Sequence, residues 1–143
     1  MKIALTQPKA LIRTAAVLTV LFAGGHTSGF PWTPVVDSHT QPVIAAMHDV
    51  HFDVLGKLRS FEDFYLGFGI SISIMQIALG CVIWLIASFA DLKPGATRLI
   101  LSIISLSFLA QAYLAWRYFF LPPLVFSVLV ALLLLAAAAR IRT

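Results

Sequence analysis

The stretch FEDFYLGFGISISIMQIALGCVIWLIASFA, residues 61–90, decides the class of fold. After Asp63 it contains no charged residue. An α-helix needs about 20 consecutive apolar residues to cross the hydrocarbon core of a bilayer, and this stretch is longer than that. The sequence therefore predicts a transmembrane helix over residues 61–90.

Three further apolar stretches predict three more membrane-spanning helices. They lie at residues 9–26, 96–119 and 123–140. The whole chain of 143 residues is 60% hydrophobic and 11% charged, whereas soluble domains are about 45–50% apolar and about 25% charged. We expect an all-α membrane protein with four transmembrane helices in a bundle, and a single integral membrane domain over residues 1–143.

The first apolar stretch has two interpretations. Basic residues precede it, its apolar core is short, and the small residues 23–25 follow, which is the pattern of a cleaved signal peptide. The same pattern fits a short first transmembrane helix. We favour the retained helix, because three other spans already make this a membrane protein. Cleavage would leave three spans and an N-terminus on the outer side.

Residues 27–60 are expected to form an outer segment. The turn-forming residues from His26 to Pro34 predict an ordered loop. Apolar residues then recur at helical spacing, which predicts an amphipathic helix over residues 42–58 on the outer side. In that helix His51 would lie on the apolar face, and Asp53 and Lys57 would form an i,i+4 pair on the wet face.

The start of the second span carries a local helix signal. The sequence Ser60-Phe-Glu-Asp63 predicts a capping box, in which the side chains of the first and last residue each bond the backbone N–H of the other.

The basic residues predict which side of the membrane each loop faces. Of the 10 Lys and Arg residues, all except Lys57, Arg59 and Arg117 fall on the side of the two termini in a four-span arrangement. Short loops rich in Lys and Arg stay in the cytoplasm. We therefore expect a multi-pass protein of a bacterial inner membrane with its N- and C-termini in the cytoplasm.

The residues that could carry chemistry gather on the outer side. All four histidines and five of the 6 acidic residues lie there. The candidate catalytic residues are His26, His51, Asp63 and Arg117. An alternative is that Glu62 and Asp63 form a structural ion pair with Arg117, since charges at a membrane edge usually pair.

A metal site is a weaker interpretation of the same histidines. His48 and His51 would lie one helical turn apart and both reach one ion. No recognised metal-binding motif accompanies them, so interfacial polar residues are the simpler explanation. The sequence predicts no cofactor.

Two glutamines are the strongly polar side chains expected inside the membrane. Helix geometry places Gln76 and Gln111 within about 6 Å of each other in depth, so we expect them to link two helices. The small residues Gly69, Ser73, Ser102 and Ser105 are suited to close helix contact.

Several protein classes are disfavoured. The single cysteine, Cys81, excludes the disulfide chemistry of quinone-coupled reductases. No acidic residue lies in mid-membrane, which argues against a proton-coupled exporter. The basic residues are scattered singly, which argues against a nucleic-acid partner.

Four short stretches resemble a group of uncharacterised small bacterial inner-membrane proteins. They are GHTSGFPWT (25–33), FDVLG (52–56), DFYLGFG (63–69) and WRYFF (116–120). The resemblance covers nearly the whole chain and implies a four-helix bundle with a retained first helix. It implies no activity and therefore no catalytic residue.

Two functions remain as hypotheses. The first is an accessory or assembly protein, whose partners would be the lipid bilayer and a second copy or another membrane protein. The second is a membrane-embedded enzyme of the isomerase or oxygenase type, acting on a lipophilic small molecule with the outer His, Asp and Arg residues. A transporter is weaker, because only the two glutamines could line a polar path.

Overall fold

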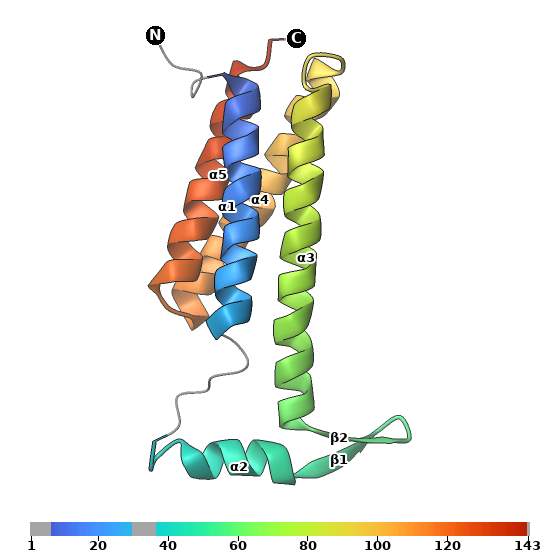
Figure 1. Ribbon diagram of the computed structural model, residues 1–143, viewed down its shortest axis with the longest axis vertical. Coiled ribbons are helices and arrows are strands. Elements are labelled where there is room, and N and C mark those ends of the chain that lie inside the picture. The colour runs from blue at the N-terminus through green and yellow to red at the C-terminus, as the bar shows by residue number, and fades with distance from the viewer. Residues whose placement is uncertain (1–6, 30–36, 143) are drawn as a thin grey trace. The chain divides into compact units, whose positions relative to one another are not determined.

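A computed structural model describes residues 7–29 and 37–142 and contains four long helices (Figure 1). They are α1 (Pro8–Gly29), α3 (Phe61–Phe89), α4 (Pro94–Tyr118) and α5 (Leu121–Arg140). Each is long and apolar enough to cross a membrane. The structure thus has a long apolar helix at each of the four predicted spans, and the spans themselves stay a prediction. Helix α1 continues through Gly29, so the expected loop from His26 begins with its last helical turn. The remainder of that expected loop, residues 30–34, lies outside the described residues.

The predicted capping box at the start of α3 is confirmed. The Ser60 backbone N–H donates to Asp63 Oδ2 at 3.0 Å, and the Asp63 N–H donates to Ser60 Oγ at 3.2 Å. The two bonds satisfy two backbone groups at the helix end, and the two acidic residues of its first turn face the positive end of the helix dipole.

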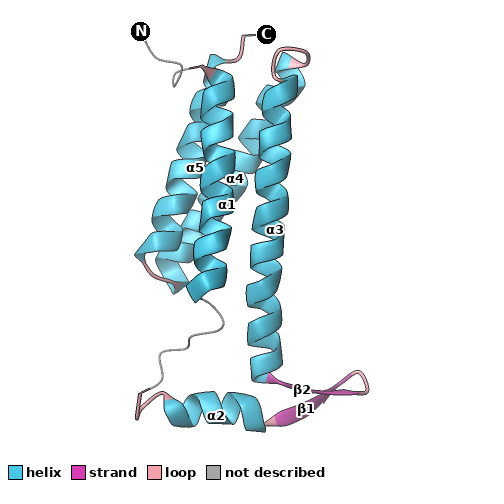
Figure 2. Ribbon diagram, in the orientation of Figure 1, coloured by secondary structure: helices cyan, strands magenta, loops and turns pink. Residues whose placement is uncertain are grey.

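The predicted helix over residues 42–58 is wrong in its second half. Helix α2 covers only Gln41–Asp49, and an antiparallel hairpin follows it, formed by β1 (His51–Val54) and β2 (Lys57–Ser60) (Figure 2). Asp53 is therefore not an i,i+4 partner of Lys57. Its carboxylate accepts a bond from the Gly56 N–H at 3.2 Å, which closes the turn.

The turn of this hairpin holds a leucine in an unfavourable conformation. Leu55 has φ +54° and Gly56 has φ +82°. A two-residue turn with positive φ at both positions matches the twist of a hairpin and is usually Asn-Gly or Asp-Gly. A leucine in the left-handed region costs about 1–2 kcal/mol, and the Leu55 side chain is 100% exposed.

The chain forms two compact units. Unit 1 contains Met1–Phe22 and Gln76–Thr143, and unit 2 contains Ala23–Met75. The core of unit 1 draws buried residues from all four long helices, among them Ile12, Ile83, Leu101 and Leu134. The arrangement of the whole chain as one bundle stays a prediction.

Helices α4 and α5 pack closely in unit 1. The buried Ser105 hydroxyl donates to the backbone oxygen of Ala131 at 2.9 Å. Ala112 and Ala115 on α4, and Ala131 and Ala138 on α5, are also buried. Small residues and a serine across the contact are typical of helix pairs in lipid. The expectation for Ser105 is confirmed, whereas Ser102 is exposed and bonds the Arg98 carbonyl of its own helix.

A second close contact in unit 1 joins α1 and α3. A Cβ atom at Gly80 would lie 2.6 Å from Cγ2 of Val20 and 3.2 Å from the Ala16 backbone oxygen. Such distances are below van der Waals contact, so only glycine fits this position without a shift of the Val20 side chain or of α1.

Polar contacts also connect the helices of unit 1. Gln76 Nε2 donates to Gln111 Oε1 at 3.2 Å, which confirms the predicted link between two helices. Near the C-terminal end of α3, the Arg13 guanidinium lies 5.2 Å from the centre of the Trp84 ring. Lys9 pairs with Asp91 in the turn that follows α3. The start of α1, the turn after α3 and the end of α5 thus lie at one end of unit 1 (Figure 1).

Candidate functional site

The structure gives His26 a partner that the sequence did not indicate. His26 lies in the last turn of α1, and its Nδ1 is 3.0 Å from the Ser73 hydroxyl on α3. Thr27 Oγ1 lies 2.8 Å from the same hydroxyl. Ser73 is buried. These three side chains connect the end of α1 to α3 within unit 2.

His51 does not lie on the apolar face of a helix. It begins strand β1 and is exposed, and its Nδ1 is 3.0 Å from the backbone oxygen of Asp49. The prediction that His51 lies on the apolar face of an amphipathic helix is wrong, because α2 ends at Asp49.

Asp63 is engaged at the start of α3 by the capping box. Ten residues separate it from Ser73 on the same helix, which corresponds to about 15 Å along the axis. Because His26 contacts Ser73, His26 and Asp63 lie at different levels of α3. The role of these residues in catalysis stays a prediction.

The charged residues of the alternative ion pair each have a neighbour of their own. Glu62 pairs with His48 inside unit 2. Arg117 belongs to unit 1, where its guanidinium lies 5.9 Å from the centre of the Tyr118 ring. Its meeting with Glu62 and Asp63 stays a prediction.

The geometry expected for a metal site at His48 and His51 is not present. His48 lies in α2 and His51 in β1, so the two are not one turn apart on a helix. Within residues 7–29 and 37–142, no three His, Cys, Asp or Glu side chains gather where they could hold a metal ion. In the same segment Asp37 accepts bonds from the Thr40 and His39 N–H groups at 2.8 Å. These bonds lower the pKa of Asp37 below its usual value.

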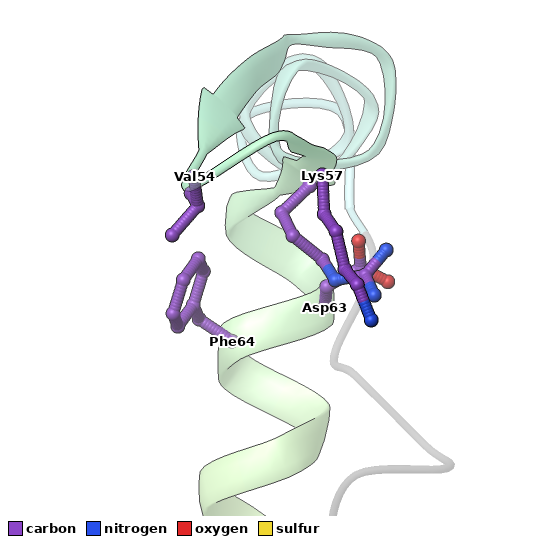
Figure 3. A pocket seen from close by; sticks show the side chains of 5 residues that line it. Val54, Lys57, Asp63 and Phe64 are labelled. Carbon is purple, nitrogen blue, oxygen red and sulfur yellow. The ribbon is translucent and has the colours of Figure 1, made fainter.

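Sequence reasoning missed a hollow between the hairpin and the start of α3. Its volume is about 630 Å³, and it is lined by Val54, Lys57, Arg59, Asp63 and Phe64. Figure 3 shows Val54 and Phe64 turned toward each other on one side, with Lys57 and Asp63 on the other. The sequence shows two basic residues, Lys57 and Arg59, close to several phenylalanines. That these residues share one surface depends on the strand pairing of the hairpin, which the sequence did not predict.

Comparison of the chain with protein families, curated proteins and solved structures found no match.

The His48–Glu62 pair in unit 2 makes a specific pH prediction. The hydrogen bond to Glu62, followed by the charge of Glu62, raises the pKa of His48 above its ordinary value of 6.5. While Glu62 is ionised, the pair is therefore strongest below pH 6.5, where His48 is protonated in both the folded and the unfolded chain, and it weakens as the pH rises through the raised pKa.

An NMR titration of the His48 ring in the full chain in detergent micelles measures this pKa. The Glu62→Gln variant should lower it toward 6.5. Asp53→Asn removes an exposed hairpin carboxylate that makes no contribution to the shift and should leave it unchanged. Equal titration of the wild-type and Glu62→Gln proteins would contradict the pairing.

Proposed function

We propose that the protein is a multi-pass protein of a bacterial inner membrane, with both termini in the cytoplasm, and that it has an accessory or assembly role that needs no cofactor. We place it in the group of small four-helix membrane proteins that it resembles, with α2 and the hairpin as its outer segment.

One observation carries the proposal: polar side chains of the apolar helices contact other groups of the same chain. Gln76 bonds Gln111, Ser105 bonds the Ala131 carbonyl, and Ser73 contacts His26. Polar groups in lipid need such partners, and bonds between helices are their usual use. Because these polar side chains bond other helices of the same chain, they do not form a polar path for a solute. This supports a protein that acts through its outer surface and not a transporter.

The surface of α4 supports the same role. Large apolar side chains stand exposed along this helix, among them Leu99, Leu106 and Trp116. Lipid or the helices of another membrane protein can cover such a surface.

The proposed topology has a direct test. A reporter that is active only in the cytoplasm should work when fused before Met1 and when fused after Thr143, because four spans return the chain to its starting side. The Lys9–Asp91 pair, which joins the start of α1 to the turn after α3, supports the same arrangement. A C-terminal reporter that works only outside the cytoplasm would contradict it.

The accessory role is tested with a strain that lacks the gene. We expect quantitative proteomics of its membranes to show the loss of specific membrane proteins, and the wild-type gene to restore them. Leu106→Glu places a charge on the exposed surface of α4 and should fail to restore them if that surface binds a partner. Leu132→Glu, at an exposed apolar position in the middle of α5, is the matched control. A deletion strain with an unchanged membrane proteome would overturn the role.

A membrane enzyme is the second candidate, and the His26–Ser73 contact is the observation that favours it. A histidine that bonds a buried hydroxyl can serve as a general acid or base. This hypothesis predicts that the strain lacking the gene has altered amounts of lipophilic metabolites. A His26→Ala protein that folds normally should then fail to restore those amounts. Full complementation by His26→Ala, His51→Ala and Arg117→Lys would exclude it.

A further inference from the structure

The hairpin presents two cations and two apolar side chains on one face. In the register of the strands Phe52 lies opposite Arg59 and Val54 opposite Lys57. Because side chains alternate along a strand, these four residues share a face. Phe52 contacts Phe61 and Phe64 of α3, with ring centres 4.9 Å and 6.0 Å apart. This face therefore packs toward α3 and forms the wall of the hollow.

The hollow has an excess of positive charge. The ion pairs among the described residues are Lys9–Asp91 and His48–Glu62, and neither includes Lys57 or Arg59. Arg59 donates one bond, from Nη1 to the Leu58 carbonyl at 2.9 Å, and keeps further N–H donors. Asp63 is the single acid of the lining, and its carboxylate is held by the Ser60 N–H. One cation therefore remains uncompensated.

An apolar track leads away from this charge along α3. Phe64 stacks on Phe52 and is followed one turn later by Phe68, at 6.1 Å between ring centres. Phe68 is 67% exposed. The fully exposed Leu55 at the tip of the hairpin adds a second apolar group beside the cations. A membrane phospholipid combines the complementary features, a negative phosphodiester next to acyl chains.

We propose that this hollow binds the phosphodiester of an anionic phospholipid from the adjacent leaflet, with Lys57 and Arg59 at the phosphate and an acyl chain along Phe64 and Phe68. The site rests on the proposed position of the hairpin at the outer membrane interface. It is independent of the accessory role.

The probe is dihexanoyl phosphatidylglycerol, titrated into the purified full chain in neutral detergent. Shifts of the hairpin amide signals in NMR spectra report the affinity and the place of binding. Dihexanoyl phosphatidylcholine has the same chains and a zwitterionic headgroup without net charge, and glycerol phosphate has no chains. Phosphatidylglycerol is expected to bind at least about 10-fold more tightly than either. Equal binding of glycerol phosphate would show a simple anion site and overturn the lipid proposal.

Variants of the two cations test the site. The double variant Lys57→Gln, Arg59→Gln should weaken phosphatidylglycerol binding about 30-fold, since each basic residue near an anionic lipid raises the affinity by a factor of about 5. Lys57→Arg keeps the charge and should keep the affinity. Lys93→Gln with Arg98→Gln is the matched control at another pair of cations and should change it less than about 2-fold. Unchanged affinity in a folded Lys57→Gln, Arg59→Gln protein would overturn the site.

A separate measurement tests the position of the hairpin. In bicelles that contain a spin-labelled lipid, the Leu55 and Gly56 amide signals should broaden. If they do not, both the outer-interface position and the lipid site fail. If they broaden while the cation variants bind normally, the lipid site alone fails.

Discussion

Substitution of Gly80 by alanine is expected to destabilise the protein by about 1–3 kcal/mol, the usual cost of adding atoms to a closely packed contact. The new Cβ would overlap Val20 and approach the Ala16 carbonyl, so the Val20 side chain or α1 itself would have to shift. Denaturant unfolding of the purified protein in detergent measures the loss.

Gly67 on the same helix is the matched control, because a Cβ there would meet no atom within 4 Å. Gly67→Ala should cause no loss, and the better helix propensity of alanine favours a small gain. Adding Val20→Ala to Gly80→Ala removes the overlapping methyl group and should recover part of the stability. Equal stabilities of the two alanine variants would contradict the close approach of α1.

Removal of both capping side chains is expected to cost about 2 kcal/mol. The Ser60→Ala, Asp63→Ala protein loses the two side-chain bonds to the Ser60 and Asp63 N–H groups at the start of α3, and a negative charge at the positive end of the helix dipole. The same unfolding measurement applies.

Two controls separate the cap from general effects. Asp63→Asn keeps an oxygen that can accept the Ser60 N–H bond, so it should retain most of the stability. Ser107→Ala removes an exposed hydroxyl that bonds only the Ile103 carbonyl of its own helix, and it should change stability by less than about 0.5 kcal/mol. A double variant as stable as Ser107→Ala would show that the cap contributes nothing.

The sequence predicted those features that depend on neighbouring residues or on simple length. The four long apolar helices follow from the length of each apolar stretch, and the Ser60–Asp63 cap from four consecutive residues. The Gln76–Gln111 bond followed from helix length alone, because it places both side chains near the middle of two predicted spans, where an amide needs a partner.

The hairpin could not be read in the same way. Residues 42–58 have apolar side chains at helical spacing, and Leu55 occupies a turn position where Asn or Asp would have signalled a hairpin. The contact of His26 with Ser73 depends on how two distant helices pack, which no local pattern reports. That Lys57 and Arg59 lie on one face with Phe52 and Val54 follows from the strand pairing, so it could not be predicted from the sequence.

The Gln76–Gln111 bond has a consequence for how the chain enters the membrane during synthesis. A glutamine amide that faces lipid alone is costly, and each of these two finds its partner on the other helix. The turn between α3 and α4 is short and consists of residues 90–93. Insertion of α3 and α4 as one hairpin, leaving the protein-conducting channel together, would keep both amides paired from the moment they meet lipid. On this basis, ribosome-bound chains that end between α3 and α4 should hold α3 inside the channel, whereas longer chains from which Gln111 has emerged should release it.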